Sequence, residues 1–322
     1  MKTPARIRFA NLPTPIEMLP RLSAALAGPR LLIKRDDLTG LAFGGNKTRK
    51  LEFLLAEAQA YGAKTVITAG AVQSNHCRQT AAACARLGFT CQLVLSGEKP
   101  LVATGNLLLD QLFNASLTWT TLEHRDQALQ ATFQAAWEAG KRPYLIPYGG
   151  SNPTGAAAYV FAMKEMLDQD CQPDWVVFAS SSSGTQAGLV TGARLFNYRG
   201  KVLGISVDES EADLKANVAR LANATAEALG EKISLTPDDI LVSANYLGGG
   251  YGVMGEAEIE AIRLFARTEG LLLDPVYTGR AAAGLIDLIR KGFFKPDETV
   301  LFWHSGGTPA LFSEKYAGLA NT

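Results

Sequence analysis

The chain has 322 residues, of which 47% are hydrophobic and 19% charged, and 31 Lys and Arg residues balance 31 Asp and Glu residues. This even charge excludes an electrostatic footprint for nucleic acid, and no apolar run approaches the ~18 residues of a membrane helix. Because the first eleven residues also lack the apolar core of a signal peptide, we expect a soluble cytoplasmic protein with no membrane partner, long enough for two domains.

Strand-like and helix-like patterns alternate along the chain. Short apolar segments predict strands at 31–34, 65–69, 90–95, 117–121, 143–146, 175–179, 201–207 and 299–304. The helical patterns between them include 48–61, 75–87, 126–139, 156–167, 185–196, 213–229, 256–269 and 280–291. Such alternation predicts an α/β fold with mostly parallel sheets covered by helices. Glycine-rich turns follow several of these strands and form a candidate rim for one site, since ligands bind at the carboxyl ends of strands.

Lys47 stands where two glycines run into a helix-like segment. The first turn of a helix has unpaired N–H groups and the positive end of the macrodipole, which disfavour an ammonium and lower the pKa of a lysine. A neutral amine is a nucleophile, so Lys47 is a candidate to form a Schiff base with a carbonyl compound such as pyridoxal phosphate. The alternative is a solvated lysine beside a flexible glycine pair.

A second polar stretch, Ser74, Asn75 and His76, lies between the strand 65–69 and an alanine-rich helix. Ser74 or Asn75 could be an ordinary N-cap. A helix N-terminus with these side chains is also a good receptor for a carboxylate, because backbone N–H groups and side-chain donors converge there. One stretch can serve both purposes.

A third stretch, 179–188, places four serines, Gly184 and Thr185 directly after a buried strand. Small hydroxyl residues and a glycine at this point form a backbone nest that suits a phosphate. The stretch lacks the lysine of a nucleotide loop and the spacing of a dinucleotide site, so a monophosphate fits better than a nucleotide. The alternative is an ordinary polar turn.

Two later turns complete the set. Tyr277 and Thr278 precede a helix, and Ser305 follows the strand 299–304. A hydroxyl at the end of a strand is often only solvated, but it can also hydrogen-bond a heteroaromatic nitrogen and keep that nitrogen neutral. The four cysteines and three histidines show no metal-type spacing, so we expect reduced thiols and no metal site.

The motifs at 34–39, 44–52, 73–76, 183–188, 272–279 and 305–307 follow one another in the order of a known family. In these motifs the chain resembles the fold-type II pyridoxal-phosphate enzymes of the tryptophan synthase β superfamily. Within it, the chain is similar to the branch of D-cysteine desulfhydrase, 1-aminocyclopropane-1-carboxylate deaminase and L-cysteate sulfo-lyase. The resemblance implies a larger cofactor-binding domain from 1–49 and 157–322, a smaller inserted domain from 50–156, a cofactor in the cleft between them, and a homodimer.

The resemblance also implies roles for individual residues. Lys47 would hold the cofactor and shuttle the substrate proton, with Ser74 and Tyr277 as the other catalytic residues. The implied substrate-binding residues are Asn75, His76, Tyr251 and Thr278. The implied cofactor-binding residues are Lys47, Lys50, Asn75, Ser183, Gly184, Thr185, Gln186 and Ser305, the last at the pyridine nitrogen.

The resemblance implies a small amino acid as substrate, and Thr278 bears on which one. The ring-opening deaminases carry a glutamate at this position, so a threonine favours β-elimination, first of D-cysteine to pyruvate, ammonia and sulfide. L-Cysteate, with its sulfonate held by His76, Arg78 or Arg280, is the alternative, although these groups could equally be solvated surface charges. Three other functions also stay open: ring opening, β-replacement with an added nucleophile, and non-catalytic binding of a phosphorylated metabolite. The sequence also leaves open which enantiomer of the substrate is used.

Overall fold

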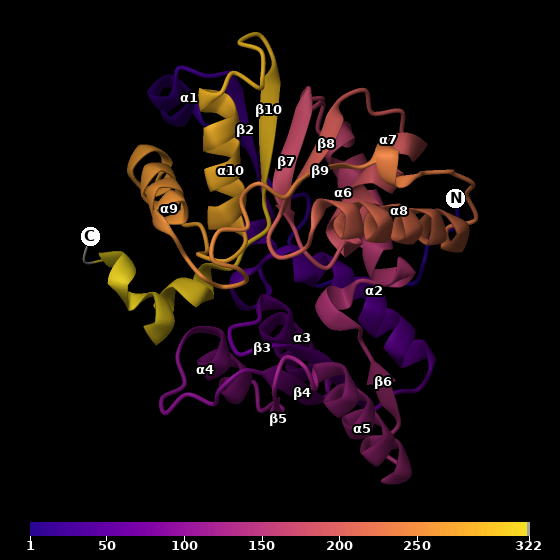
Figure 1. The fold of residues 1–322 in the computed structure, drawn as a ribbon. Helices are drawn as coiled ribbons and strands as arrows, with labels where there is room; N and C mark the ends of the chain where they lie inside the picture. Colours follow the sequence, from indigo (N-terminus) through magenta and orange to yellow (C-terminus); the bar gives the residue numbers. More distant parts are fainter. Residues whose placement is uncertain (321–322) are drawn as a thin grey trace.

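The computed structural model describes residues 1–320, which form two separate sheets (Figure 1). The larger sheet has the order β1 (Ile16–Met18), β2 (Arg30–Arg35), β10 (Thr299–His304), β7 (Trp175–Ser180), β8 (Lys201–Ser206), β9 (Leu241–Ser243). The smaller sheet has the order β5 (Ser116–Thr120), β4 (Thr90–Ser96), β3 (Thr65–Ala71), β6 (Pro143–Leu145). All neighbouring strands are parallel except β1 and β2. The predicted fold class is therefore confirmed.

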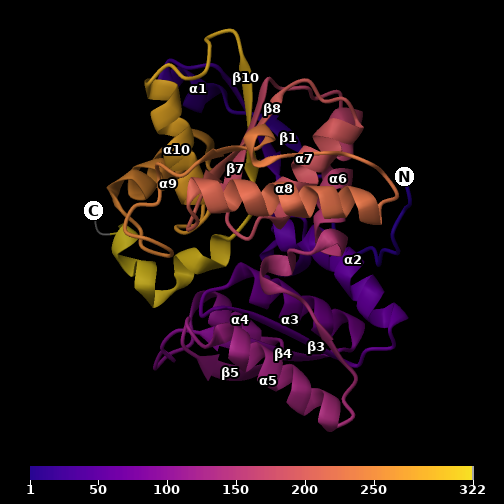
Figure 2. The ribbon, with the colours of Figure 1, turned by 45° about the vertical axis from the view of Figure 1, so that its right-hand side comes forward.

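Helices cover both faces of the larger sheet. The α-helices are α1 (Pro20–Leu26), α2 (Asn46–Ala60), α3 (Asn75–Leu87), α4 (Gly105–Leu112), α5 (Arg125–Glu138), α6 (Pro153–Asp168), α7 (Gly184–Leu195), α8 (Glu211–Ala228), α9 (Glu256–Glu269) and α10 (Thr278–Arg290). Figures 1 and 2 show α1, α9 and α10 on one side of the larger sheet and α6, α7 and α8 on the other. Within residues 1–320, every helix falls short of the length or apolar character that a membrane crossing requires.

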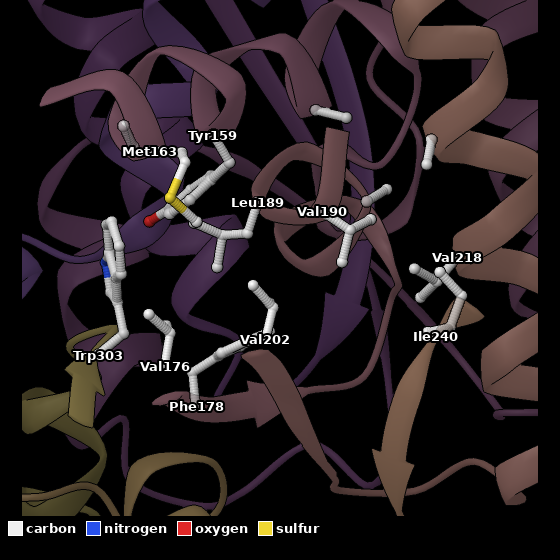
Figure 3. Packing of buried hydrophobic residues seen from close by; sticks show 14 of the residues in the cluster. Tyr159, Met163, Val176, Phe178, Leu189, Val190, Val202, Val218, Ile240 and Trp303 are labelled. Carbon is white, nitrogen blue, oxygen red and sulfur yellow. The ribbon is translucent and has the colours of Figure 1, made fainter. Parts of the chain in front are cut away.

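Alternate residues of the central strands pack into two different cores. On β7, Val176 and Phe178 join the cluster with α6, α7 and α8, while Val177 joins the cluster with α1, α9 and α10. Figure 3 shows the first cluster, in which Met163 and Leu189 lie over these strand residues. Because the sheet is buried on both faces, its strands read as continuous apolar runs in the sequence. Burying such side chains stabilises the fold by roughly 2 kcal/mol each.

Helix α2 takes part in the packing of both sheets. Phe53 packs in the cluster beneath α6 and α7, whereas Leu51, Leu54 and Leu55 pack in the cluster of the smaller sheet. The helix that begins beside Lys47 is thus shared between the two cores. The strands of the smaller sheet all fall inside the predicted domain 50–156, but its boundaries stay a prediction, since α2 and α6 also pack against each other.

A buried charged cluster fixes α2 to the larger sheet. Arg49 donates from Nε and Nη2 to the Asp36 carboxylate, at 2.9 and 2.7 Å, and also pairs with Glu165. Asp36 accepts two further hydrogen bonds, from the Tyr159 hydroxyl at 2.6 Å and Trp303 Nε1 at 2.8 Å. In Figure 3 the Tyr159 and Trp303 side chains lie next to each other. Burial alone would lower the pKa of Arg49, but the two carboxylates raise it above its ordinary value.

Two strands were not predicted, β1 and β9. Each has three residues and lies at an edge of the larger sheet, where only one neighbour pairs with it. A segment this short shows too little alternation to be recognised as a strand.

Candidate active site

A pocket with about 600 Å³ of empty space, part of it open to solvent, lies at the carboxyl ends of strands from both sheets. Ser74 follows β3, Tyr148 follows β6, Ser181 follows β7 and Ser305 follows β10, and all of them line it together with Lys47 at the start of α2. The strand ends thus form the rim that the glycine-rich turns predicted.

Lys47 is the second residue of α2 and lines the pocket. Burial lowers the pKa of its amine to about 8. Within residues 1–320, no carboxylate lies within ion-pair distance of this amine. The sequence argument attributed a lowered pKa to the helix N-terminus, whereas desolvation is the cause found here. A substantial neutral fraction at physiological pH makes Lys47 a competent nucleophile.

Hydroxyl and N–H groups gather at the end of the pocket beside β7 and α7. Ser181, Ser182, Ser183 and Thr185 line it, and α7 begins at Gly184, so the first N–H groups of the helix have no intrahelical partner. Ser183 adopts φ +66° at this turn. The Ser180 hydroxyl is buried without a hydrogen-bond partner among the described residues. Because no acidic residue lines the pocket, this end suits a phosphate group.

Ser74 serves both purposes that the sequence left open. Its Oγ caps α3 by accepting a hydrogen bond from the N–H of Cys77 at 3.2 Å, and its side chain also lines the pocket. The neighbouring Asn75 accepts a hydrogen bond from Asn106 at 2.9 Å, which orients its amide. The N-terminus of α3 therefore presents hydroxyl, amide and backbone donors to one wall of the pocket.

His76 lines the same wall as a neutral acceptor. The Thr68 hydroxyl donates to the carbonyl of Ile146, so the 2.9 Å contact between that hydroxyl and His76 Nε2 requires the proton to be on Nε2. Nδ1 is then an unprotonated acceptor, and it has no partner within residues 1–320. Burial, followed by the charges of Lys47 and Lys50, holds the pKa of His76 well below its usual range. This ring cannot supply a positive charge for an anion.

Tyr277 lines the pocket and Tyr251 lies behind it. The two hydroxyl oxygens are 2.5 Å apart, and the rings meet edge to face with centroids 5.9 Å apart. Tyr251 lines a second, neighbouring cavity with Gln73 and Tyr316. Tyr251 therefore contacts a residue that lines the first pocket without lining that pocket itself.

Thr278 differs from expectation, because it does not line the pocket. Its hydroxyl donates to the Asp274 carboxylate at 2.8 Å and accepts from the Asp274 N–H at 2.8 Å, so both functions of this group are used inside the fold. The same carboxylate accepts the N–H groups of Val276, Tyr277 and Thr278. Thr278 therefore holds the turn that presents Tyr277.

The two arginines expected as sulfonate holders or surface charges are neither. Arg78 is buried and donates to the carbonyls of Ala42 and Gly44. Arg280 is buried in an ion pair with Glu258 at 2.8 Å and donates to three main-chain carbonyls. Both guanidinium groups brace loops, and both expectations for them are wrong.

Three expected cofactor residues lie behind the lining. Lys50 donates to the carbonyl of Gly149 at 3.1 Å, and burial holds the pKa of its amine well below the ordinary value. The Gln186 side-chain amide donates to the carbonyl of Leu241 at 2.8 Å, and Gln186 does not line the pocket. Gly184 contributes backbone alone, and a Cβ there would lie 2.6 Å from Ser151 Oγ.

The sequence analysis missed Asn46 and Tyr148, both of which line the pocket. Asn46 donates to the Thr185 hydroxyl at 3.2 Å, which links α2 to the serine-rich turn. The signal for Asn46 was its place directly before Lys47, and the signal for Tyr148 was its place before the glycines of the turn after β6.

Comparison with known proteins identifies the family. The model of the pyridoxal-phosphate dependent enzyme family matches residues 7–306. The chain belongs to this family. The crystal structure of an ACC deaminase homologue is 37% identical, with a TM-score of 0.89 over 98% of this chain and 96% of that one.

More distant structures share the fold. A hydrogen sulfide-producing enzyme from Fusobacterium nucleatum is 14% identical, with a TM-score of 0.66 over 94% of this chain and 96% of that one. Cysteine synthase from Entamoeba histolytica is 15% identical, with a TM-score of 0.66 over 100% of this chain and 94% of that one.

The residues present fit the cofactor of the family. Lys47 supplies an unpaired amine, the serine-rich turn supplies phosphate donors, and Ser305 supplies a hydroxyl at another side of the pocket. The unpartnered Ser180 hydroxyl and His76 Nδ1, both on lining residues, are polar atoms that a bound ligand can satisfy. The donor set is therefore that of a pocket for a phosphorylated carbonyl compound.

Proposed function

We propose that this enzyme catalyses β-elimination of a small amino acid with an uncharged side chain, with D-cysteine giving pyruvate, ammonia and sulfide as the first candidate. One observation carries the proposal: Lys47 is the only cationic side chain among the lining residues, and no carboxylate lines the pocket. Such a pocket accepts the substrate carboxylate and the cofactor phosphate through neutral donors, and it has nothing left to pair with a charged side chain.

Each step has a residue suited to it. Backbone N–H groups at the start of α3 and the side chains of Ser74 and Asn75 would bind the substrate carboxylate. Pyridoxal phosphate, held by Lys47 and the serine-rich turn, supplies the electron-withdrawing ring that stabilises negative charge on the α-carbon. The Lys47 amine, with its pKa of about 8, would take the α-proton, and the Tyr277 hydroxyl would donate a proton to the departing group.

L-Cysteate is the weaker alternative within this chemistry. Its sulfonate needs a cation, and the three groups that could have supplied one are a neutral imidazole, His76, and two arginines already bound to carbonyls, Arg78 and Arg280. Burying an unpaired sulfonate would cost several kcal/mol. We therefore expect little sulfite release.

Ring opening of 1-aminocyclopropane-1-carboxylate is the second candidate, because the ACC deaminase homologue is 37% identical over nearly the whole chain. Against it, position 278 holds a threonine whose hydroxyl is bound to Asp274, so no carboxylate is available there. A thiol leaving group needs only α-deprotonation and a proton donor, both of which the pocket offers.

The deciding experiment assays D-cysteine, L-cysteate, β-chloro-D-alanine and 1-aminocyclopropane-1-carboxylate under identical conditions, with Lys47→Ala as the control for background. We expect pyruvate from D-cysteine and β-chloro-D-alanine without any co-substrate, which also separates elimination from β-replacement. Dominant 2-oxobutyrate would assign ring opening, and sulfite as the fastest product would assign L-cysteate. A purified protein that stays colourless with added pyridoxal phosphate would favour a non-catalytic binder.

A further inference from the structure

The turn after β6 and the serine-rich turn after β7 touch each other behind the end of the pocket that suits a phosphate. A Cβ on Gly149 would lie 2.8 Å from Ser182 Cβ, and a Cβ on Gly184 would lie 2.6 Å from Ser151 Oγ. A side chain at either glycine would therefore force the two turns to shift. Their contact places Ser151, which does not line the pocket, beside Ser182, which does.

The hydrogen bonds of Ser151 fix the direction in which its proton points. Its Oγ accepts from the Gly184 N–H at 3.3 Å and from the Lys50 amine at 3.5 Å. A hydroxyl has two lone pairs and one proton, so both lone pairs are then occupied. The proton has two acceptors within reach, Ser182 Oγ at 2.9 Å and the Gly149 carbonyl at 3.5 Å. Ser151 is therefore the donor to Ser182, the nearer of the two.

Because Ser182 accepts from Ser151, it keeps its own proton. Among the described residues 1–320, that proton has no acceptor, and Ser182 lines the pocket. Thr185 is in the same state, since its hydroxyl accepts from the Asn46 amide at 3.2 Å. The protons of both hydroxyls are thus available to a ligand in a pocket that no carboxylate lines, which suits an anionic oxygen.

Ser181 shows the opposite arrangement in the same turn. Its hydroxyl donates to the Asp208 carboxylate at 3.1 Å, so only its lone pairs remain for the pocket. A serine that lines this turn is therefore not a donor by default. Whether its proton is available depends on the residue behind it.

We propose that Ser151 is a positioning residue of the cofactor site: it donates to Ser182, so that the Ser182 hydroxyl donates its own proton to the phosphate of pyridoxal phosphate. Lys50 holds the arrangement in place, because its amine also donates to the Gly149 carbonyl at 3.1 Å and ties this turn to α2. Without Ser151 the Ser182 hydroxyl is free to rotate, and the phosphate loses an oriented donor. This role does not depend on which amino acid the enzyme converts.

Pyridoxal, which lacks the phosphate, isolates the effect. Calorimetry measures the affinity of the apoenzyme for pyridoxal phosphate and for pyridoxal, and the ratio of the two affinities reports the contribution of the phosphate. We expect Ser151→Ala to lower this ratio about tenfold, as the loss of one hydrogen bond to a charged group does, and to change the pyridoxal affinity by less than about twofold. An unchanged ratio, or equal losses for both compounds, would overturn the proposal.

Ser23→Ala is the matched control. Ser23 is also half-buried, and its hydroxyl accepts the Leu31 N–H at 3.0 Å near the amino end of β2, whereas the pocket lies at the carboxyl ends of the strands. This variant loses a hydrogen-bonded serine hydroxyl at the other end of the sheet. The affinity ratio should therefore stay as in the unaltered protein.

A double variant tests whether Ser151 acts through Ser182. Ser182→Ala removes the donor itself, so adding Ser151→Ala should lower the ratio no further, whereas losses that multiply would overturn the proposal. Phosphorus NMR of the holoenzyme should show the phosphate resonance shifted in the same direction by either single variant; opposite shifts would also overturn it. None of these measurements uses turnover. The expected ratios with no pyruvate from any amino acid would therefore support the role of Ser151 while the proposed reaction fails.

Discussion

The main chain at Gly306 crosses the main chain at Gly45 so closely that a Cβ on Gly306 would lie 2.6 Å from the Gly45 Cα. Both residues have positive φ, +89° and +123°. The crossing is closed by a hydrogen bond of 2.9 Å from the Asn46 N–H to the Ser305 carbonyl. It joins the end of β10 to the start of α2 and so sets the distance between Ser305 and Lys47.

Gly306→Ala should therefore separate these two segments. An alanine at φ +89° is strained by about 1 kcal/mol, and the contact with Gly45 adds roughly 2 kcal/mol of overpacking. Gly270→Ala is the matched control, because Gly270 has φ +68° but no heavy atom within 4 Å of the added Cβ. Urea unfolding and cofactor affinity are measured on the two variants. Gly270→Ala should lose only the stability that backbone strain costs, whereas Gly306→Ala should lose more stability and also bind the cofactor more weakly. Equal behaviour of the two variants would mean that the crossing does not matter.

Lys47→Ala should abolish catalysis and the lysine-linked absorption band, because the other buried amine nearby, Lys50, already donates to the carbonyl of Gly149. Borohydride reduction followed by peptide mapping should find the pyridoxyl group on Lys47. A label on Lys50 or Lys34 would show that the reactive lysine is misassigned.

Ser74→Ala should lower turnover far more than stability. Loss of the cap on α3 costs about 1 kcal/mol, whereas loss of a hydroxyl that binds the substrate carboxylate lowers the rate by roughly 10- to 100-fold. Thermal melts and pyruvate assays on the same preparation separate the two effects. A large drop in melting temperature with turnover intact would leave Ser74 as a cap only.

The Glu165 carboxylate should stabilise the fold only above acidic pH. Burial raises its pKa, but hydrogen bonds and charges from Arg49 and Lys34 outweigh burial and lower the pKa from 4.5 to about 2. A depressed folded-state pKa gives stability that is complete above about 4.5 and is lost as the pH falls toward 2.

Glu165→Gln should accordingly lose roughly 3 kcal/mol of unfolding free energy at neutral pH and progressively less as the solution is acidified. Urea unfolding at a series of pH values measures this difference. Glu260→Gln is the control, since its pair with Arg290 is half exposed and should contribute less than about 1 kcal/mol. A loss for Glu165→Gln that does not change with pH would show that packing, and not charge, is responsible.

Local signals explain what could be predicted from the sequence. The predicted bounds of α3 and α9 coincide with those found, because Ser74 caps the first helix and Gly88 and Gly270 end the two helices in left-handed conformations. The strands buried on both faces were found because burial makes them continuous apolar runs.

Long-range contacts explain what was missed. Arg78 and Arg280 bind carbonyl oxygens from distant loops, and no local pattern indicates that such carbonyls converge. Thr278 was expected to face the substrate because the resemblance places it where the ring-opening deaminases carry a glutamate, but its hydroxyl turns back to Asp274. Tyr148 was missed because its one signal, an aromatic residue before two glycines, is also typical of an ordinary turn.

The sharing of α2 between the two cores has a geometric consequence. Phe53 of α2 packs in the core of the larger sheet, and Leu54 packs in the core of the smaller one. If the two sheets rotate relative to each other, α2 would therefore lie near the axis of the rotation. Points near an axis travel least, so Lys47 would keep its place while Ser74, which follows β3 of the smaller sheet, moves relative to Tyr277, which precedes α10. In such a rotation the Lys47 amine would stay in place while the width of the pocket changes.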